Sequence, residues 1–331
     1  MTVAVIDVDY IKYSVASAGE TRTIKAYHPI TGDEWECKTR TELWGHYLKK
    51  DKGILVEFNK TNGTAYTADE LVVVDIQTPE PIQNVYHSAK SMFETALRHL
   101  NTNKYVAYVG KGDSFRVERS TILKYKGQRS NSLKPLLLDD VSEYLIKKYK
   151  AEVVTHFEAD DKVVMEAYNK DDYVVVGIDK DYAGCHVKWF NPNKYEDGVV
   201  DCRKFGELFL NQKGGVKGFG RLFFYHQILS GDSSDNYKAN SANPEFEWGD
   251  KSSYKLLKDC KTDKEALEAI KKGYQLIYPE PRTIVGWRGD EIEVDWKYCA
   301  KENFDLARML RWENDNVDFY EVLNKFGLLE D

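Results

Sequence analysis

The sequence lacks three features, and each absence excludes a class of protein. No stretch approaches the ~20 consecutive apolar residues of a transmembrane helix. The N-terminus carries aspartates directly after its first apolar run and has no basic segment, so we expect no signal peptide. The five cysteines are scattered without a Cys-x-x-Cys spacing. That dispersal argues against a zinc site or a disulfide framework and favours a cytoplasmic protein with reduced thiols.

The sequence also lacks an overall positive charge. Its formal net charge is −7, which taken alone argues against nucleic acid as a partner. The charge is unevenly distributed, however, because residues 111–135 contain seven basic and two acidic side chains. An acidic chain with one basic segment fits a protein that binds metal in one place and phosphate groups in another.

The order of apolar and helical patterns predicts an α/β fold. Short β-branched runs alternate with stretches of helical period, which is typical of a central, mostly parallel sheet with flanking helices. The strand-like runs are residues 3–8, 104–109, 151–155 and 173–178, and the helical stretches are residues 82–100, 140–150 and 160–170.

The length of 331 residues suggests one large and one small domain. We expect an α/β domain over residues 1–230 and a helical region over residues 231–331. A β-rich insertion is expected at about residues 20–80, where Asn62-Gly63 predicts a hairpin turn. Farther along, residues 205–211 are expected to form a short helix, and the glycine-rich residues 214–220 a flexible connection.

Carboxylates are concentrated where the predicted strands end. Because the carboxyl ends of parallel strands share one edge of a sheet, we expect these groups to lie close together. The densest stretch is Glu-Ala-Asp-Asp at residues 158–161. The candidate ligands are Asp7, Glu158, Asp160, Asp161, Asp179, Asp181, Asp232 and Asp235. A second aspartate, Asp9, follows Asp7 at strand spacing and would share its face.

Carboxylates massed in this way repel one another unless a cation lies between them. Mg²⁺ takes one or two direct carboxylates and keeps several waters, which further carboxylates can hold. Two such ions ~3.5–4 Å apart can activate a water and stabilise the leaving oxygen of a phosphodiester. An acidic residue before a helix also has a purely structural explanation, since it meets the helix dipole favourably. Four acidic groups at successive element ends favour metal instead, so we expect two or more Mg²⁺ ions, with Mn²⁺ able to substitute.

Four short motifs occur in the order Tyr-Lys-Gly-Gln-Arg at 125–129, Glu-Ala-Asp-Asp at 158–161, Gly-Ile-Asp-Lys-Asp at 177–181 and Gly-Asp-Ser-Ser-Asp-Asn at 231–236. In order and roughly in spacing, they resemble those of the 5′-nuclease, or flap endonuclease, superfamily. The similarity is greatest to bacteriophage 5′→3′ exonucleases, including those with ribonuclease H activity. It covers residues 1–19 and 82–255, and more weakly the segment at 306–312.

The resemblance implies a PIN-like core and a role for each matching position. It implies that all eight carboxylates hold divalent metal, and that Asp161 and Asp179 act in catalysis. Lys126 would orient or neutralise the scissile phosphate, in agreement with the ability of cationic groups to stabilise developing negative charge. Arg116, Tyr125, Lys126 and Arg129 would contact DNA on a basic arch at about residues 111–135. The partner would be DNA with 5′ ends or flaps, with RNA–DNA hybrids as an extension.

Three departures from that pattern stand out. The family has a further aspartate after the strand at 104–109, and here the nearest substitute is Asp113. The glycine-rich hairpin of a helix-three-turn-helix DNA clamp is replaced by a polar stretch at 236–246, so we expect a degenerate clamp in the DNA-binding C-terminal region. The insertion at 20–80 lies outside the usual core.

Two functions of different classes follow from these observations. One is a metal-dependent 5′→3′ exonuclease or flap endonuclease acting in phage-type DNA replication, recombination or degradation. The other is a non-catalytic DNA-binding replication accessory protein on the same fold. The near-complete set of carboxylates favours the enzyme, because a degenerate scaffold would have lost several of them.

Overall fold

The structure, a computed structural model, describes residues 2–45 and 52–330. The chain divides into two compact units, which are considered one at a time. The first consists of residues 1–11, 91–133 and 143–331, and the second of residues 12–90 and 134–142. Residues 143–331 therefore fall within one unit, and this division does not coincide with the boundary predicted at residue 230.

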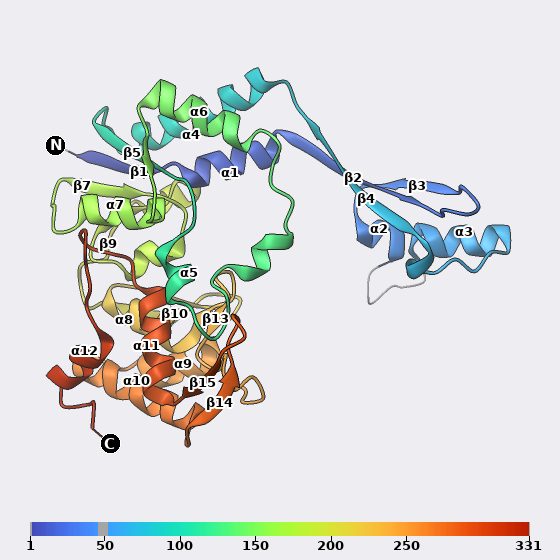
Figure 1. Cartoon of the computed structure of the whole chain (residues 1–331). Helices are drawn as coiled ribbons and strands as arrows, with labels where there is room; N and C mark the ends of the chain where they lie inside the picture. The colour runs from blue at the N-terminus through green and yellow to red at the C-terminus, as the bar shows by residue number, and fades with distance from the viewer. Residues whose placement is uncertain (1, 46–51, 331) are drawn as a thin grey trace. The chain divides into compact units, whose positions relative to one another are not determined.

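A six-stranded sheet forms the centre of the first unit (Figure 1). Five strands are parallel, and only the edge strand β9 runs antiparallel to its neighbour β8. The prediction of an α/β fold with a mostly parallel sheet is confirmed at this level. In sheet order the strands are β6 (Glu152–Val154), β5 (Tyr105–Gly110), β1 (Val3–Asp7), β7 (Tyr173–Val176), β8 (Lys188–Phe190) and β9 (Val199–Asp201).

Helices pack on both faces of this sheet. On one face, Val163 of α7 (Ala159–Ala167) is buried with Val5 and Val175 of the strands. On the other face, Phe93 of α4 (Ile82–His99) stacks on Tyr149 of α6 (Leu138–Tyr149), with ring centroids 3.9 Å apart. Side chains alternate between faces along a strand, so Asp7 shares the α7 face with Val5.

The remainder of the first unit is mostly helical and has its own apolar core, built largely from α8, α10 and α11. Residues 205–211 do not form the predicted helix, because residues 207–210 pair as a strand with residues 216–219, which were expected to be a flexible connection. None of the described helices is long and apolar enough to cross a membrane. The helices are α5 (Phe115–Arg119), α8 (Arg221–Ser230), α9 (Asp250–Leu257), α10 (Asp263–Ile277), α11 (Trp296–Ala307) and α12 (Phe319–Lys325). The short strands form the pairs β10 (Glu207–Leu210) with β11 (Val216–Phe219), β12 (Gly231–Asp232) with β13 (Tyr237–Lys238), and β14 (Arg282–Val285) with β15 (Glu291–Val294).

The second unit contains the predicted insertion, a three-stranded antiparallel sheet with helices on one side (Figure 1). The predicted hairpin at Asn62-Gly63 is wrong, since these residues end helix α3. Gly63 has φ 68° and donates its N–H to the carbonyl of Asn59, a left-handed helix end that suits glycine. The elements are β2 (Glu20–Tyr27), β3 (Glu34–Cys37), β4 (Val72–Pro79), α2 (Arg40–Trp44) and α3 (Ile54–Asn62), with α1 (Asp9–Ala18) leading in.

Candidate metal centre

Asp7 ends β1 at the carboxyl edge of the sheet and is only 7% exposed. Its carboxylate accepts hydrogen bonds from the backbone N–H of Asp9 (2.9 Å) and from the hydroxyl of Tyr182 (2.9 Å). Burial, and next the charge of Asp9, raise the pKa of Asp7 to about 7. A cation bound beside Asp7 would stabilise its ionised carboxylate, which burial and the charge of Asp9 disfavour when no cation is present.

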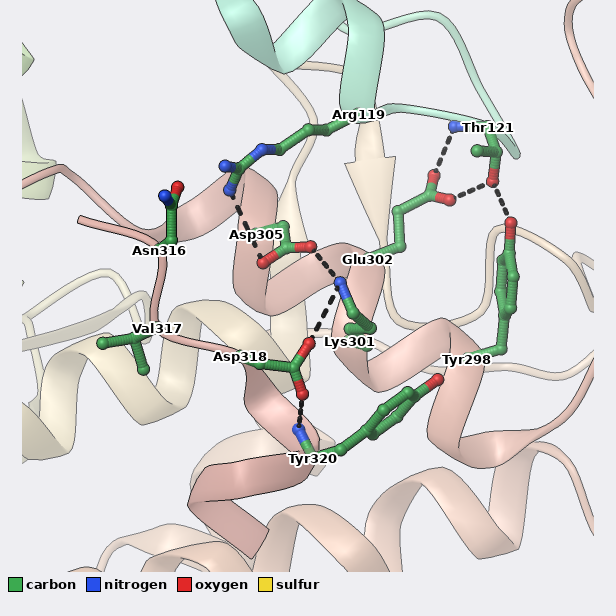
Figure 2. Close-up of a pocket in the computed structure, with 10 residues that line it drawn as sticks. All are labelled: Arg119, Thr121, Tyr298, Lys301, Glu302, Asp305, Asn316, Val317, Asp318 and Tyr320. Atoms are coloured by element: carbon green, nitrogen blue, oxygen red, sulfur yellow. Dashed lines mark hydrogen bonds and ion pairs between the residues drawn. The ribbon is translucent and has the colours of Figure 1, made fainter. Parts of the chain in front are cut away.

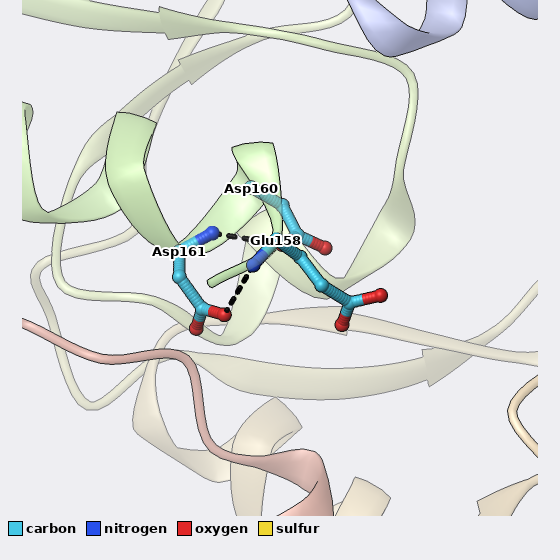
Figure 3. Close-up of side chains that lie close together, drawn as sticks. All are labelled: Glu158, Asp160 and Asp161. Carbon is cyan, nitrogen blue, oxygen red and sulfur yellow. Dashed lines mark hydrogen bonds between the residues drawn. The ribbon is translucent and has the colours of Figure 1, made fainter. Parts of the chain in front are cut away.

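The densest acidic stretch forms the start of α7 (Figure 3). Glu158, Asp160 and Asp161 each offer an oxygen within 4.8 Å of the others. Glu158 caps the helix, and its own N–H donates to Asp161 Oδ2 (3.3 Å), which closes a capping box. Figure 3 shows the carboxylates of Glu158 and Asp160 extending to one side and that of Asp161 turning to the other.

Asp161 is fully buried and bound by Arg116. The guanidinium donates two parallel bonds to the carboxylate, at 2.7 and 2.8 Å, and the N–H of Leu310 donates a third at 3.0 Å. Arg116 also donates to the carbonyls of Leu306 (3.0 Å) and Arg308 (2.8 Å). Both oxygens of Asp161 are thus occupied, which favours a structural role over the predicted roles in metal binding and catalysis.

Arg116 and Tyr125 do not lie where DNA could contact them. Arg116 is 2% exposed and Tyr125 4% exposed. The guanidinium binds Asp161 and Glu158, and the Tyr125 hydroxyl lies 3.0 Å from Glu158 and 2.8 Å from Asp235. The prediction that these two side chains contact phosphates is therefore contradicted by their burial. They position the carboxylates instead.

Lys126 reaches the same carboxylates from the solvent side. Its ammonium forms an ion pair with Glu158 and lies 3.9 Å from Asp235. Its backbone has φ 54°, a left-handed conformation that costs a non-glycine residue on the order of 1 kcal/mol. Its N–H donates to the carbonyl of Asp235 (2.9 Å), which helps to hold this loop in place. Arg129, half-exposed, binds Asp235 at 2.9 Å.

The remaining carboxylates follow β7 and α8. Asp179 accepts the N–H of Asp181 (2.9 Å) and caps a short helical turn at Lys180–Gly184. Asp181 accepts a hydrogen bond from Gln227 of α8. Asp232 pairs with Lys180 at 2.7 Å and accepts the N–H and hydroxyl of Ser234, both at 2.6 Å.

Burial and neighbouring charges raise the pKa of some carboxylates of the centre, Asp235 among them, and lower the pKa of others. Burial, and then the neighbouring Glu158, raise the pKa of Asp160 well above its usual value. Burial, and then Asp179, do the same for the pKa of Asp181. For Glu158 and Asp232, burial acts to raise the pKa, but the neighbouring basic side chains have the larger effect. The net result is a lowered pKa for both residues. Asp7, Asp160 and Asp181 are thus the groups that most need a further positive charge.

Asp113 lies apart from the other predicted ligands. It is exposed in the loop after β5, and within residues 2–45 and 52–330 it makes no hydrogen bond or ion pair. The other eight predicted ligands are connected through shared hydrogen bonds or through electrostatic effects on one another's pKa. The carboxylates of four chain segments are thus linked to one another, Glu158, Asp160 and Asp161 form the closest group found among the described residues, and Asp113 lies outside.

Sequence reasoning did not assign Tyr182, Lys180 or Gln227 to the centre. Tyr182 is fully buried and donates to Asp7, and Lys180 pairs with Asp232. Both belong to the run Asp-Lys-Asp-Tyr at residues 179–182, so their closeness to two candidate ligands was a usable signal. Gln227 had no such signal, because its contact with Asp181 depends on how α8 packs.

The donor set suits a hard divalent cation. It consists of carboxylate oxygens, with no cysteine and no histidine in it, as expected for Mg²⁺ or Mn²⁺. Among the described residues, Asp7, Asp160, Asp179 and Asp181 make no ion pair, and of these four Asp160 belongs to the group whose oxygens all lie within 4.8 Å of one another. The neighbouring Lys126 and Lys180 balance part of the negative charge, so the centre as it stands is less repulsive than its count of acids suggests.

No family model matches the chain, and no curated protein matches it. A function must therefore be inferred from the chemistry of the site.

A cavity in the first unit is a separate feature (Figure 2). It has a volume of about 550 Å³ and is lined by α11 and by the segment before α12. Its charged groups already pair with one another: Lys301 lies 2.6 Å from Asp305 and 3.7 Å from Asp318. It shares no residue with the acidic centre, and its self-contained ion pairs point to no particular ligand.

Proposed function

We propose that this protein is a magnesium-dependent nuclease that hydrolyses phosphodiester bonds near the 5′ ends of DNA. In this proposal it acts as a 5′→3′ exonuclease or flap endonuclease of the PIN-like 5′-nuclease type. RNA in RNA–DNA hybrids is an additional substrate class. Replication, recombination or degradation of DNA in the manner of bacteriophages is the setting that the motif resemblance implies.

One observation carries the proposal. Hydrogen bonds and electrostatic effects link carboxylates of four chain segments at the carboxyl edge of a parallel sheet, and the oxygens of Glu158, Asp160 and Asp161 lie within 4.8 Å of one another. A lysine in a strained backbone conformation stands beside them. Strained residues of this kind concentrate at functional sites, because the surrounding structure must hold them there.

The proposed chemistry assigns tasks to this chain's own residues. Ionised Asp7, Asp160 and Asp181 would hold the divalent ions, whose positive charge supports attack by water on the phosphate. Lys126 would leave Glu158 in part and turn to a non-bridging phosphate oxygen, where its charge stabilises the transition state. Arg129 would bind a neighbouring phosphate, which positions the strand without reading its sequence.

The test is digestion of three 5′-labelled substrates: a DNA duplex, a duplex with a 5′ flap, and an RNA–DNA hybrid. Each is incubated with the protein in Mg²⁺ or in EDTA. We expect cleavage near the 5′ end in Mg²⁺ and none in EDTA. DNA binding without metal-dependent cleavage of any of the three would contradict the proposal and support the non-catalytic DNA-binding protein.

A further inference from the structure

Asp9 lies against the acidic centre but has no role in the function proposed above. It is the first residue of α1, and its N–H donates to Asp7 Oδ1 (2.9 Å). Its own Oδ1 accepts the N–H of Gly110, the last residue of β5, at 3.1 Å. The Asp9 carboxylate therefore lies over the carboxyl end of the strand next to β1.

Gly110 leaves room for that carboxylate. A Cβ added at position 110 would lie 2.8 Å from Asp9 Oδ2, closer than real contacts allow, and 3.4 Å from the backbone nitrogen of Ala159. The backbone of Gly110 is not in the left-handed region, so its conformation does not demand glycine. The glycine is explained by space: Asp9 fills the position that a side chain at 110 would take, between the end of β5 and the start of α7.

We propose that Asp9 is a further carboxylate of the metal centre. It belongs to α1, the helix after β1, and it lies at the end of β5, where the strand itself has only Gly110. The proposal rests on the proposed function, because it assumes that the centre binds divalent metal. Asp9 would hold the ion beside Asp7, directly or through one of its waters.

The simpler explanation of Asp9 is that an aspartate at a helix start interacts favourably with the helix dipole. That explanation accounts for an acid at the first position of α1. It does not account for the space at Gly110 that the Asp9 carboxylate fills, or for the placement of a second acidic side chain beside the buried Asp7. A cation held by both carboxylates accounts for the two acids lying side by side.

The test measures Mn²⁺ binding by the full chain with calorimetry and electron paramagnetic resonance, together with the melting temperature of the metal-free protein. Asp9→Asn should weaken Mn²⁺ binding by about tenfold or more, the scale expected when a group that orients or holds a metal is removed. Gly110→Ala keeps the charge but displaces the carboxylate, so it should weaken binding as well. Asp113→Asn, an exposed aspartate of the following loop, is the control and should leave binding unchanged.

A double variant that moves the carboxylate from residue 9 to residue 110 makes the test more specific. Asp9→Ala combined with Gly110→Asp restores one carboxylate to the same place from the other chain segment, and should recover much of the affinity that Asp9→Ala loses. A helix-dipole role predicts no such recovery, because residue 110 is not in α1.

The outcomes separate this inference from the proposed function. If Asp160→Asn abolishes Mn²⁺ binding while Asp9→Asn and Gly110→Ala leave it unchanged, Asp9 is a helix-start residue only, and the metal centre stands without it. If the unaltered protein binds no Mn²⁺, both proposals are overturned.

Discussion

At the scale of single residues, the adjacent aspartates Asp160 and Asp161 differ in their hydrogen-bond and ion-pair partners. Asp161 is enclosed by Arg116 and backbone N–H groups, whereas Asp160 accepts one hydrogen bond, from the N–H of Asp161 (2.8 Å). A buried ion pair that loses one partner leaves the other charge uncompensated. The two side chains should therefore respond in opposite ways to the same substitution.

We expect Asp161→Asn to lower the free energy of unfolding by roughly 3–5 kcal/mol, because it leaves Arg116 buried without its main partner. Asp160→Asn should leave the metal-free protein as stable as before, or more so, while removing Mg²⁺ binding and cleavage. Urea unfolding and Mg²⁺ titration of both variants check this. A stable but inactive Asp161→Asn protein would instead support the predicted catalytic role of Asp161.

Lys126 should matter for turnover more than for folding. We expect Lys126→Ala to lower the cleavage rate by about 10²-fold or more, in the range found when a group that stabilises transition-state charge is removed. Lys124→Ala is the matched control, since Lys124 is exposed two positions earlier and packs over Trp287 rather than the carboxylates. Single-turnover rates on a 5′-labelled duplex compare the two. Equal cleavage rates for the two variants would mean that Lys126 does not contribute to catalysis.

At the scale of elements, the segment after α11 ties the centre to the C-terminal part of the chain. Asp315, almost fully buried, binds Arg308 at 2.8 Å and Arg311 at 2.8 and 2.9 Å. The same segment presents the N–H of Leu310 and the carbonyl of Arg308 to the Asp161–Arg116 pair. The ion pairs of Asp315 should therefore help to fix the position of Asp161 at the start of α7.

We expect Asp315→Ala to destabilise the protein by about 3 kcal/mol or more, because it leaves buried Arg308 without its carboxylate. Hydrogen exchange at the amide of Leu310 should become faster, since that N–H is held within the same segment. Glu313→Ala is the control: Glu313 is an exposed carboxylate of the same segment and pairs only at the surface, with Lys162. Unchanged exchange at Leu310 in the Asp315 variant would mean that the segment is held by its apolar contacts alone.

Which elements could be predicted from sequence depends on how local their cause is. β1, β5 and β7 are apolar runs buried by their own composition, and their predicted positions agree with the structure to within a few residues. Asn62-Gly63 was misread because the left-handed conformation that glycine allows suits both a hairpin turn and a helix end. Residues 207–210 become a strand only through pairing with residues 216–219, a tertiary cause that periodicity does not contain.

The candidate site shows the same division. Strand ends located the carboxylates, because chain order alone brings the ends of parallel strands to one edge. The sequence could not show that Arg116 is buried, since its partners include the carbonyl of Leu306, 190 positions away. Nor could it show that Asp9 rather than Asp113 lies at the end of β5, because that depends on the space left by Gly110.

At the scale of the whole molecule, the acidic centre should link stability to pH and to metal. The pKa of Asp7 rises from 3.8 to about 7 through burial and the charge of Asp9, and those of Asp160 and Asp181 are raised as well. A raised pKa means that the folded state binds more protons than the unfolded chain between about pH 4 and 7. The metal-free protein should therefore lose stability as pH rises through this window. Glu158 and Asp232, whose pKa is lowered, contribute stability that is lost only below about pH 4.5.

Divalent metal should reverse the loss, since it binds the ionised carboxylates and releases their protons. We expect Mg²⁺ to raise the melting temperature much more at about pH 8 than at about pH 5, where protons compete for Asp7. Thermal unfolding in Mg²⁺ and in EDTA at both pH values measures the difference. Asp7→Asn should flatten the pH dependence of the metal-free protein, because it removes a buried group whose ionisation the fold opposes. An equal effect of Mg²⁺ at both pH values would mean that the ion binds at surface carboxylates and not at this buried centre.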